Sequence, residues 1–380
     1  MAQDPFGDIP LFREIQRILS SSSGPVNFEI AGQIAGAVAT GSGDPPLRPE
    51  AARAFDDAVH EATGVVSGYT GLVPDEPLAT RLVTRAEWAH ATLGAWKWLL
   101  EHVAGHIASE LGRIGGEGGE GEQIQQALGG VAPLLLGIQT GTVVGHLSRE
   151  ILARHELPIP RDDDGRLFLV AANVTEVAAD YSFDEPMLVR WLALREVVRE
   201  LLVTQVPWVG GYLRSRLTDI VDAIEIDPGD LESRFVELQS RGVAAFEQGM
   251  GPDSILPIAP TERHRRALER LHAFLALFQG YADHVAAGVD DSVLGDTTII
   301  DEGMTRHRLS PSDGKTMLAG VLGLQLDRTV EAAGKTFCAA VVELHGIPAL
   351  RRVWDAPDNL PSLAEIRDPF LWIERTLPGE

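Results

Sequence analysis

Cysteine is almost absent from this 380-residue chain, which contains Cys338 and no other thiol. A single cysteine cannot form an intramolecular disulfide, so no covalent cross-link ties the fold to an oxidising compartment. The first residues also lack the basic stretch and apolar run of a secretory signal. We therefore expect a cytoplasmic protein in which Cys338 is a core residue of an apolar helix and not a nucleophile.

Basic residues are also scarce, because 32 Lys and Arg stand against 55 Asp and Glu and give a formal net charge of -23. Phosphate groups are bound by clusters of Lys and Arg, so this balance argues against nucleic acid and against an anionic membrane surface as partners. The sequence has no G-x-S-x-G elbow, no Walker phosphate loop and no C-x-x-C pair. Three common sources of hydrolytic, nucleotide or redox chemistry are therefore missing.

Charged residues are missing altogether from residues 127–148, a stretch about as long as a membrane span. Gly137, Gly141 and Gly145 recur there at four-residue spacing. Small residues on one helical stripe let helices pack closely, both in membranes and in soluble cores. We predict a buried core helix here, with a membrane span as the less favoured alternative.

Helical periodicity dominates the rest of the chain, and strand signals are sparse. The sequence predicts a mainly α, multi-helical fold with at most a few short β-strands. The best strand candidate is Leu167–Val170, and the acidic glycine run 115–122 is predicted to be a flexible loop. The predicted helices span residues 25–40, 48–66, 84–112, 185–206, 209–224, 230–248, 262–289, 310–326, 330–345 and 363–376.

The DDDG run after Arg161 is a plausible boundary between two domains. We expect an N-terminal helical domain over residues 1–160 and a second helical domain over 161–380. The second contains Arg195-Glu196-Val197-Val198-Arg199, which matches a zinc-peptidase helix in all but its ligands. In H-E-x-x-H, two histidines at i and i+4 bind one zinc ion and the glutamate polarises the metal-bound water.

Several stretches beyond this helix resemble the zincin-like metallopeptidase family. This family was first described as a domain of unknown function; one branch is associated with coenzyme F420 biosynthesis, and members are often labelled hydrolases. The resemblance implies a multi-helical zincin-like scaffold and a third zinc ligand from a later segment. The matching stretches are residues 136–152, 157–160, 167–176, 191–208, 277–285 and 322–377.

The departures from the family pattern fall on the metal ligands. The resemblance places Arg195, Arg199 and Gln279 at the three ligand positions. A guanidinium group has no lone pair to offer and stays protonated, whereas zinc takes imidazole, thiolate or carboxylate donors. Two such cations about 4 Å from zinc would add several kcal/mol of repulsion each. We therefore expect no metal or other cofactor at this site, and Glu196 is left as a vestigial general base.

Two interpretations of the arginines stay open. They either pair with internal carboxylates as a structural tie, which we favour, or bind a small anionic ligand or a peptide. His272, Gln279 and Asp283 share one face of the predicted helix 262–289, and Asp283 is the first acidic partner expected for the arginines. A separate histidine pair, His102 and His106, has the i,i+4 spacing of a zinc site, although such pairs more often have other roles.

These observations predict a catalytically inactivated zincin-like homologue that keeps a cleft and has a binding or regulatory role. Whether this pseudoenzyme shares the F420 association is left open by the sequence. The alternative is an active, peptidase-like hydrolase that uses another metal site or metal-free chemistry in the same cleft. A third possibility is a partner-binding scaffold whose former active site is filled by side chains.

Overall fold

The computed structural model describes residues 24–41, 43–115, 119–226, 261–293, 295–322 and 328–377. The fold in these residues is mainly α-helical with two short strands, as the sequence predicts. The elements are α2 (Phe28–Thr40), α3 (Pro49–Thr70), β1 (Thr80–Val83), α4 (Arg85–Ala95), α5 (Lys97–Gly115), α6 (Gly119–Ser148), β2 (Leu167–Val170), α7 (Ala171–Asp180), α8 (Glu185–Gln205), α9 (Val209–Val221), α12 (Glu262–Val293), α13 (Thr298–Leu309), α14 (Asp313–Leu322), α15 (Arg328–Arg351), α16 (Leu363–Arg367) and α17 (Pro369–Thr376).

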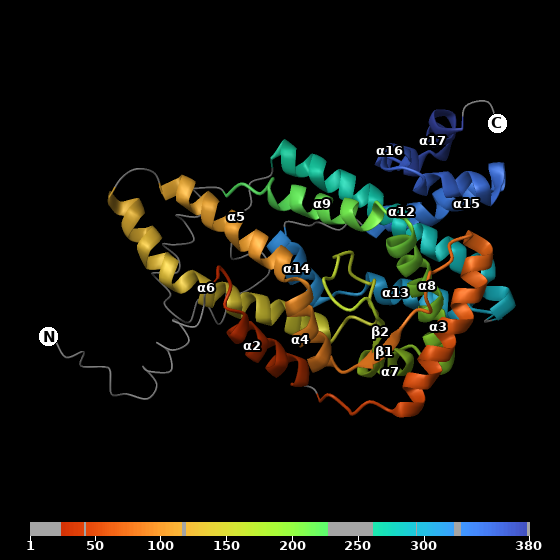
Figure 1. Ribbon diagram of the computed structural model, residues 1–380, viewed down its shortest axis with the longest axis horizontal. Helices are drawn as coiled ribbons and strands as arrows, with labels where there is room; N and C mark the ends of the chain where they lie inside the picture. Colours follow the sequence, from red (N-terminus) through yellow and green to blue (C-terminus); the bar gives the residue numbers. More distant parts are fainter. Residues whose placement is uncertain are drawn as a thin grey trace.

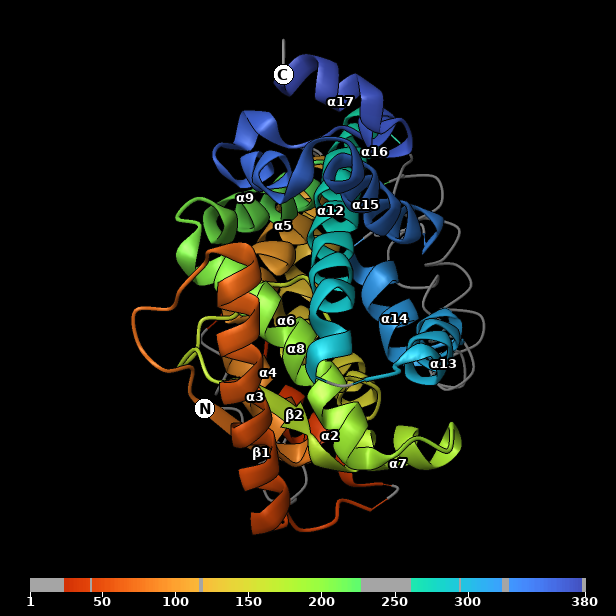
Figure 2. The ribbon, with the colours of Figure 1, turned by 90° about the vertical axis from the view of Figure 1, so that its right-hand side faces the viewer.

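Helix α8 lies at the centre of the molecule. Figure 2 shows it between α3 and α12, and it packs against both. Helices α5 and α6 run beside each other and extend away from this centre, while α15 packs along α12 at the other end (Figure 1). One continuous cluster of buried apolar side chains runs from Ala31 to Leu377. The helices therefore share a single hydrophobic core around α8.

The two strands form a small parallel sheet. Strand β2 is the strand that the sequence predicts, whereas β1 was not predicted. Thr80 pairs with Leu167 and Val83 with Val170, so the sheet joins chain segments on either side of residue 160. All four residues of β2 are buried, which explains their continuous apolar character. The division into domains at residue 160 stays a prediction.

The glycine stripe of α6 packs directly against α2. A Cβ atom on Gly137 would lie 2.5 Å from the carbonyl oxygen of Asn27, and one on Gly141 would lie 2.6 Å from that of Ala31. Real side chains do not tolerate such distances, so glycine is what lets the two backbones approach. The close packing is as expected for a core helix, although most side chains of residues 132–142 are only half-buried. Within the described residues, no helix is long and apolar enough to cross a membrane.

Several predicted helix boundaries were wrong. The predicted helix 84–112 is broken into α4 and α5 at Trp96, whose backbone leaves the helical region (φ -102°, ψ 8°). The predicted helix 363–376 is broken before Pro369, since the residue that precedes a proline is disfavoured in helical geometry. Part of the predicted loop 115–122 is helical, because α6 begins at Gly119. Apolar periodicity continues across the first two points and cannot mark them, whereas the glycine and glutamate run at 115–122 favours a loop by its composition.

Two further differences concern the second half of the chain. Helix α13 was not predicted, and α14 begins at Asp313, three residues later than expected. The predicted helix 230–248 lies outside the described residues. Near the C-terminus, Trp354 and Trp372 are 6% and 0% exposed, so this end of the chain packs onto the core. Cys338 is also fully buried, as expected for a core residue.

Candidate functional site

Helix α8 holds the residues that correspond to the metal-binding motif. Asp184 caps its N-terminus by accepting a hydrogen bond from the Met187 amide, and Pro186 in the first turn suits helix initiation. The segment from Arg195 to Arg199 lies inside this one continuous helix, as predicted. Arg195, Glu196 and Arg199 are only 2%, 1% and 6% exposed. The central charges of the motif are therefore inside the protein and not on an open surface.

Arg195 is held by carboxylates from two other helices. Its Nε donates to Asp283 of α12 at 3.1 Å, and its Nη2 donates to Asp301 of α13 at 2.8 Å. Its Nη1 lies 3.4 Å from the Trp191 carbonyl oxygen, and the guanidinium stacks 3.6 Å from the centre of the Trp191 ring. Asp283 is the partner that the sequence predicts. All three guanidinium nitrogens of Arg195 thus have internal partners.

Asp283 is also shared with a second arginine. Arg308 of α13 donates from Nη1 to the other oxygen of Asp283 at 3.1 Å. Burial by itself would raise the pKa of Asp283, but the guanidinium groups of Arg308, Arg195 and Arg199 outweigh it and lower the pKa to about 2. Asp283 is consequently a fixed negative charge at any ordinary pH, and it ties α12 to α8 and α13.

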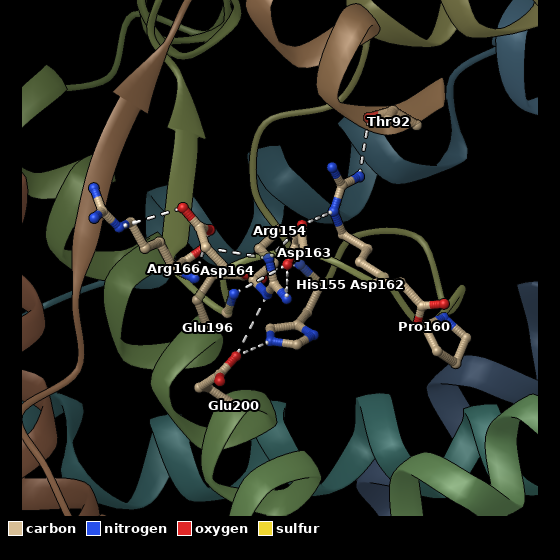
Figure 3. Close-up of polar contacts among 12 residues, drawn as sticks. Thr92, Arg154, His155, Pro160, Asp162, Asp163, Asp164, Arg166, Glu196 and Glu200 are labelled. Carbon is tan, nitrogen blue, oxygen red and sulfur yellow. Dashed lines mark hydrogen bonds and ion pairs between the residues drawn. The ribbon is translucent and has the colours of Figure 1, made fainter. Parts of the chain in front are cut away.

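Glu196, at the place of the zincin general base, is fully engaged. Its Oε1 accepts from Nη1 of Arg199 at 2.8 Å, and its Oε2 accepts from the backbone amide of His155 at 2.7 Å. The second partner comes from the segment between α6 and β2, which crosses this face of α8 (Figure 3). Both carboxylate oxygens therefore bind the protein itself. Glu196 is therefore an ion-pair partner of Arg199, which lies one turn away on the same helix.

The segment between α6 and β2 carries a charge network onto α8. His155 Nε2 lies 2.7 Å from an oxygen of Glu200, and Nε of Arg154 lies 3.6 Å from the same oxygen. Arg154 also makes two hydrogen bonds to Asp163, at 2.8 and 3.0 Å. Figure 3 shows these side chains converging above Glu196 and Glu200. We call the residues from Arg154 to Asp163 the strap.

The strap is closed upon itself and onto α4. Arg161 donates to Asp163 at 2.7 Å and to the hydroxyl of Thr92 at 2.9 Å. Burial raises the pKa of Asp163, but hydrogen bonds from Arg154 and Arg161 lower it well below its usual range. The run of aspartates that the sequence marked as a boundary is therefore an anchoring point of the strap.

The other predicted residues have different surroundings. Gln279 lies one helical turn before Asp283 on α12 and is partly exposed, and His272 lies two turns further back. A direct approach of either to Arg195 stays a prediction. His102 and His106 are bonded to the end of α9, through the Asp222 carboxylate at 2.9 Å and the Ile224 carbonyl at 2.8 Å. This histidine pair tethers α5 to α9.

Sequence reasoning missed part of this arrangement. Asp301, His155 and Arg154 join the charges of α8 through tertiary contacts that no local pattern reveals. The strap contains His155, Glu156 and Leu157, but their spacing in the sequence is not typical of a metal or catalytic site. Within the described ranges, no group of three His, Cys, Asp or Glu side chains is arranged to hold a metal ion.

Comparison with known proteins places this architecture in a family. The family model for zincin-like metallopeptidases matches residues 26–373, and the chain therefore belongs to this family. A crystal structure from Chloroflexus aurantiacus, described as "a putative hydrolase with a novel fold", is similar over 93% of this chain and 100% of that chain, with a TM-score of 0.67. The two sequences are 21% identical, so the likeness shows the fold. A comparison with curated proteins found no match.

The zinc ion that the family name implies does not fit the side chains found here. Arg195 and Arg199 offer no lone pair, and both are buried in ion pairs with Asp283, Asp301 and Glu196. A cation placed among them would have to compete with two guanidinium groups that are already present. This arrangement can hold helices together, but it lacks the donor set of a zinc site.

Proposed function

We propose that this protein is a non-catalytic member of the zincin-like family, in which the metal-binding helix has become an internal ion-pair tie. The observation that carries the proposal is the state of Glu196. Its side chain is 1% exposed, and both of its oxygens accept hydrogen bonds from the protein, from Arg199 and from the His155 amide. A general base must be within hydrogen-bond reach of a substrate or a water, and a side chain that is 1% exposed with both oxygens in internal bonds is out of reach of a substrate.

The arginines support a structural tie more than an anion site. The three nitrogens of the Arg195 guanidinium already contact Asp283, Asp301 and the Trp191 carbonyl. Binding of an anion would require these bonds to break and would leave Asp283 with Arg308 alone and Asp301 without its arginine, which is costly for the buried Asp283. A small anionic ligand or peptide at this point is therefore the weaker alternative.

The role that follows is binding or regulation on a rigid scaffold. The tie joins α8 to α12, α13 and the strap, so it fixes the relative positions of the helices around it. A binding surface would then lie elsewhere on the molecule. A cytoplasmic location and a link to coenzyme F420 biosynthesis, both suggested by the sequence, remain parts of this proposal.

An active hydrolase is the second candidate, and the family name together with the description of the Chloroflexus protein favours it. This hypothesis requires that the strap moves and frees Glu196, or that chemistry occurs at another place. It makes a distinct prediction, because hydrolysis through Glu196 must disappear in Glu196→Gln.

The test combines metal analysis with hydrolysis assays on the full chain. We expect less than about 0.1 zinc per chain after incubation with zinc and desalting, since the site lacks donors. We also expect wild type and Glu196→Gln to give the same background rate on peptide and ester substrates. The matched control is Glu76→Gln, which removes an exposed carboxylate in a loop. Stoichiometric zinc, or hydrolysis lost in Glu196→Gln and kept in Glu76→Gln, would overturn the proposal.

A further inference from the structure

A pocket lies away from α8, between α5, α6 and α14. It begins beside Trp96, where α4 ends. The cavity volume is about 50 Å³, and the space reaches about 800 Å³ only when the part open to solvent is counted. Figure 1 shows the three helices close together on the side of the molecule where α5 and α6 extend. Residues that line it include Trp96, Val103, Ala104, Gln139, Thr140 and Leu318. No residue of α8 or of the strap takes part.

The lining of this pocket is apolar and carries no charge. None of its residues is Asp, Glu, Lys or Arg, although such residues make up 23% of the chain. The charge-free segment 127–148 supplies one wall, including Gln139, Thr140 and Val143. Only the glycine stripe of this segment makes the close contact with α2. Gln139 and Thr140 are therefore left for the pocket.

The wall of the pocket contains polar side chains that carry no charge. Gln139 and Thr140 are half-buried, and their side chains form no hydrogen bond with another described residue. Buried polar groups are normally paired, so an unpaired group in a pocket wall marks a place where a ligand atom can bind.

We propose that this pocket binds a small uncharged molecule with an apolar body and one hydrogen-bonding group. Transfer of the apolar body from water to the wall of Val103, Ala104 and Leu318 is favourable in proportion to the area buried. The hydrogen-bonding group meets Gln139 or Thr140. A charged head group is excluded, because it would lose its hydration without meeting an opposite charge. This site is independent of the state of the former metal helix.

Three probes that share one ring and differ in their head group test the proposal. These are benzyl alcohol, toluene and benzoate, with dissociation constants measured by calorimetry or by ligand-detected NMR on the full chain. We expect benzyl alcohol to bind best and benzoate to bind at least about tenfold more weakly, since an unpaired carboxylate is strongly disfavoured in an apolar site. Equal binding of benzoate and benzyl alcohol would overturn the proposal.

Two variants locate the binding. Ala104→Leu fills the pocket from a residue that is 2% exposed and should weaken benzyl alcohol by about tenfold or more. Ala108→Leu makes the same change on the exposed face of α5, one turn later, and should leave binding unchanged. Equal affinities in Ala104→Leu, Ala108→Leu and wild type contradict a site in this pocket.

A third variant keeps the shape of the pocket and decides the matter if Ala104→Leu does not fold. Thr140→Val replaces the hydroxyl by a methyl group, while Thr142→Val makes the same replacement on the same helix outside the lining. We expect Thr140→Val to reduce the preference for benzyl alcohol over toluene, and Thr142→Val to keep it. If Thr140→Val changes neither the affinity for benzyl alcohol nor its preference over toluene, the assignment of the polar contact to Thr140 is rejected.

Discussion

The centre of α8 is fully buried and the C-terminal half of α6 is partly buried, and the two helices pack against their neighbours in opposite ways. Helix α8 buries Arg195, Glu196, Arg199 and Glu200, each at 6% exposure or less. Segment 127–148 of α6 contains no charged residue at all. The first is held by ion pairs to α12, α13 and the strap, and the second by glycines that let α2 approach.

The difference shows where ligand binding remains possible. Buried charges are costly unless they are paired, and Arg195 and Glu196 use their charged groups in internal pairs. The place where the family name implies zinc is therefore largely occupied by internal partners, although Nε of Arg199 has no hydrogen-bond partner among the described residues. A wall without charged residues needs no ion pairs. Its polar side chains, such as Gln139 and Thr140, can therefore face a pocket. Stability and binding are expected to respond separately to changes in the two regions.

The largest effect is expected from Arg195→Met. This change leaves the buried Asp283 without one of its two cations and the half-exposed Asp301 without its arginine, and removal of one partner of a buried ion pair costs about 3–5 kcal/mol. We expect the lower end, about 3 kcal/mol, because Asp283 keeps Arg308. Urea unfolding measures the loss. Arg190→Met, an exposed arginine on the same helix, is the control and should change stability by less than about 0.5 kcal/mol.

A second substitution sharpens that result. Adding Asp283→Leu to Arg195→Met removes the buried carboxylate that had lost its partner, and part of the lost stability should return. Strictly additive losses in the double variant would show that the two residues do not act as a pair.

The next effect concerns the uncharged region. In Gly141→Ala, the new methyl group would meet the Ala31 carbonyl oxygen at 2.6 Å, so α2 and α6 must move apart at a cost of up to about 3 kcal/mol. Gly36→Ala on α2 is the matched control, since open space surrounds that position. There the alanine should stabilise the helix by about 0.5–1 kcal/mol. Thermal unfolding of both variants measures the opposite signs, and equal signs would contradict the packing.

The pH dependence of the Asp283 tie should be somewhat smaller. A carboxyl whose pKa falls to about 2 in the folded state contributes stability above its unfolded pKa near 3.8 and loses it as the pH falls through 2. The difference corresponds to about 2 kcal/mol. The stability gap between wild type and Asp283→Asn should therefore shrink between pH 5 and pH 2. Asp75→Asn, in an exposed loop, should show no such gap at either pH.

The smallest effect is expected at the exposed start of α8. Asp184→Ala removes the side chain that accepts from the Met187 amide and should cost about 1 kcal/mol, whereas Asp184→Asn keeps an acceptor and should cost little. Chemical denaturation with both variants gives the comparison. A loss for Asp184→Ala as large as that for Arg195→Met would mean that the buried charges contribute less than we infer.

The family, the mainly helical fold class and the position of the altered motif could be predicted from the sequence. Local features determine them: the frame from Arg195 to Arg199 lies within one helix, the apolar run of β2 is a buried strand, and the glycines of α6 form a contact stripe. The partner Asp283 could also be predicted, because residues four apart on a helix share a face and the family pattern places that helix near α8.

The rest depended on contacts between distant segments. The strap meets Glu196 from 41 residues away, and Asp301 reaches Arg195 from 106 residues away. Strand β1 pairs with a partner more than 80 residues later, and a short strand of mixed burial gives little signal alone. The sequence by itself determined which residues must be buried or altered; only the tertiary structure decided which charges pair, because pairing depends on how separated helices and loops are brought together.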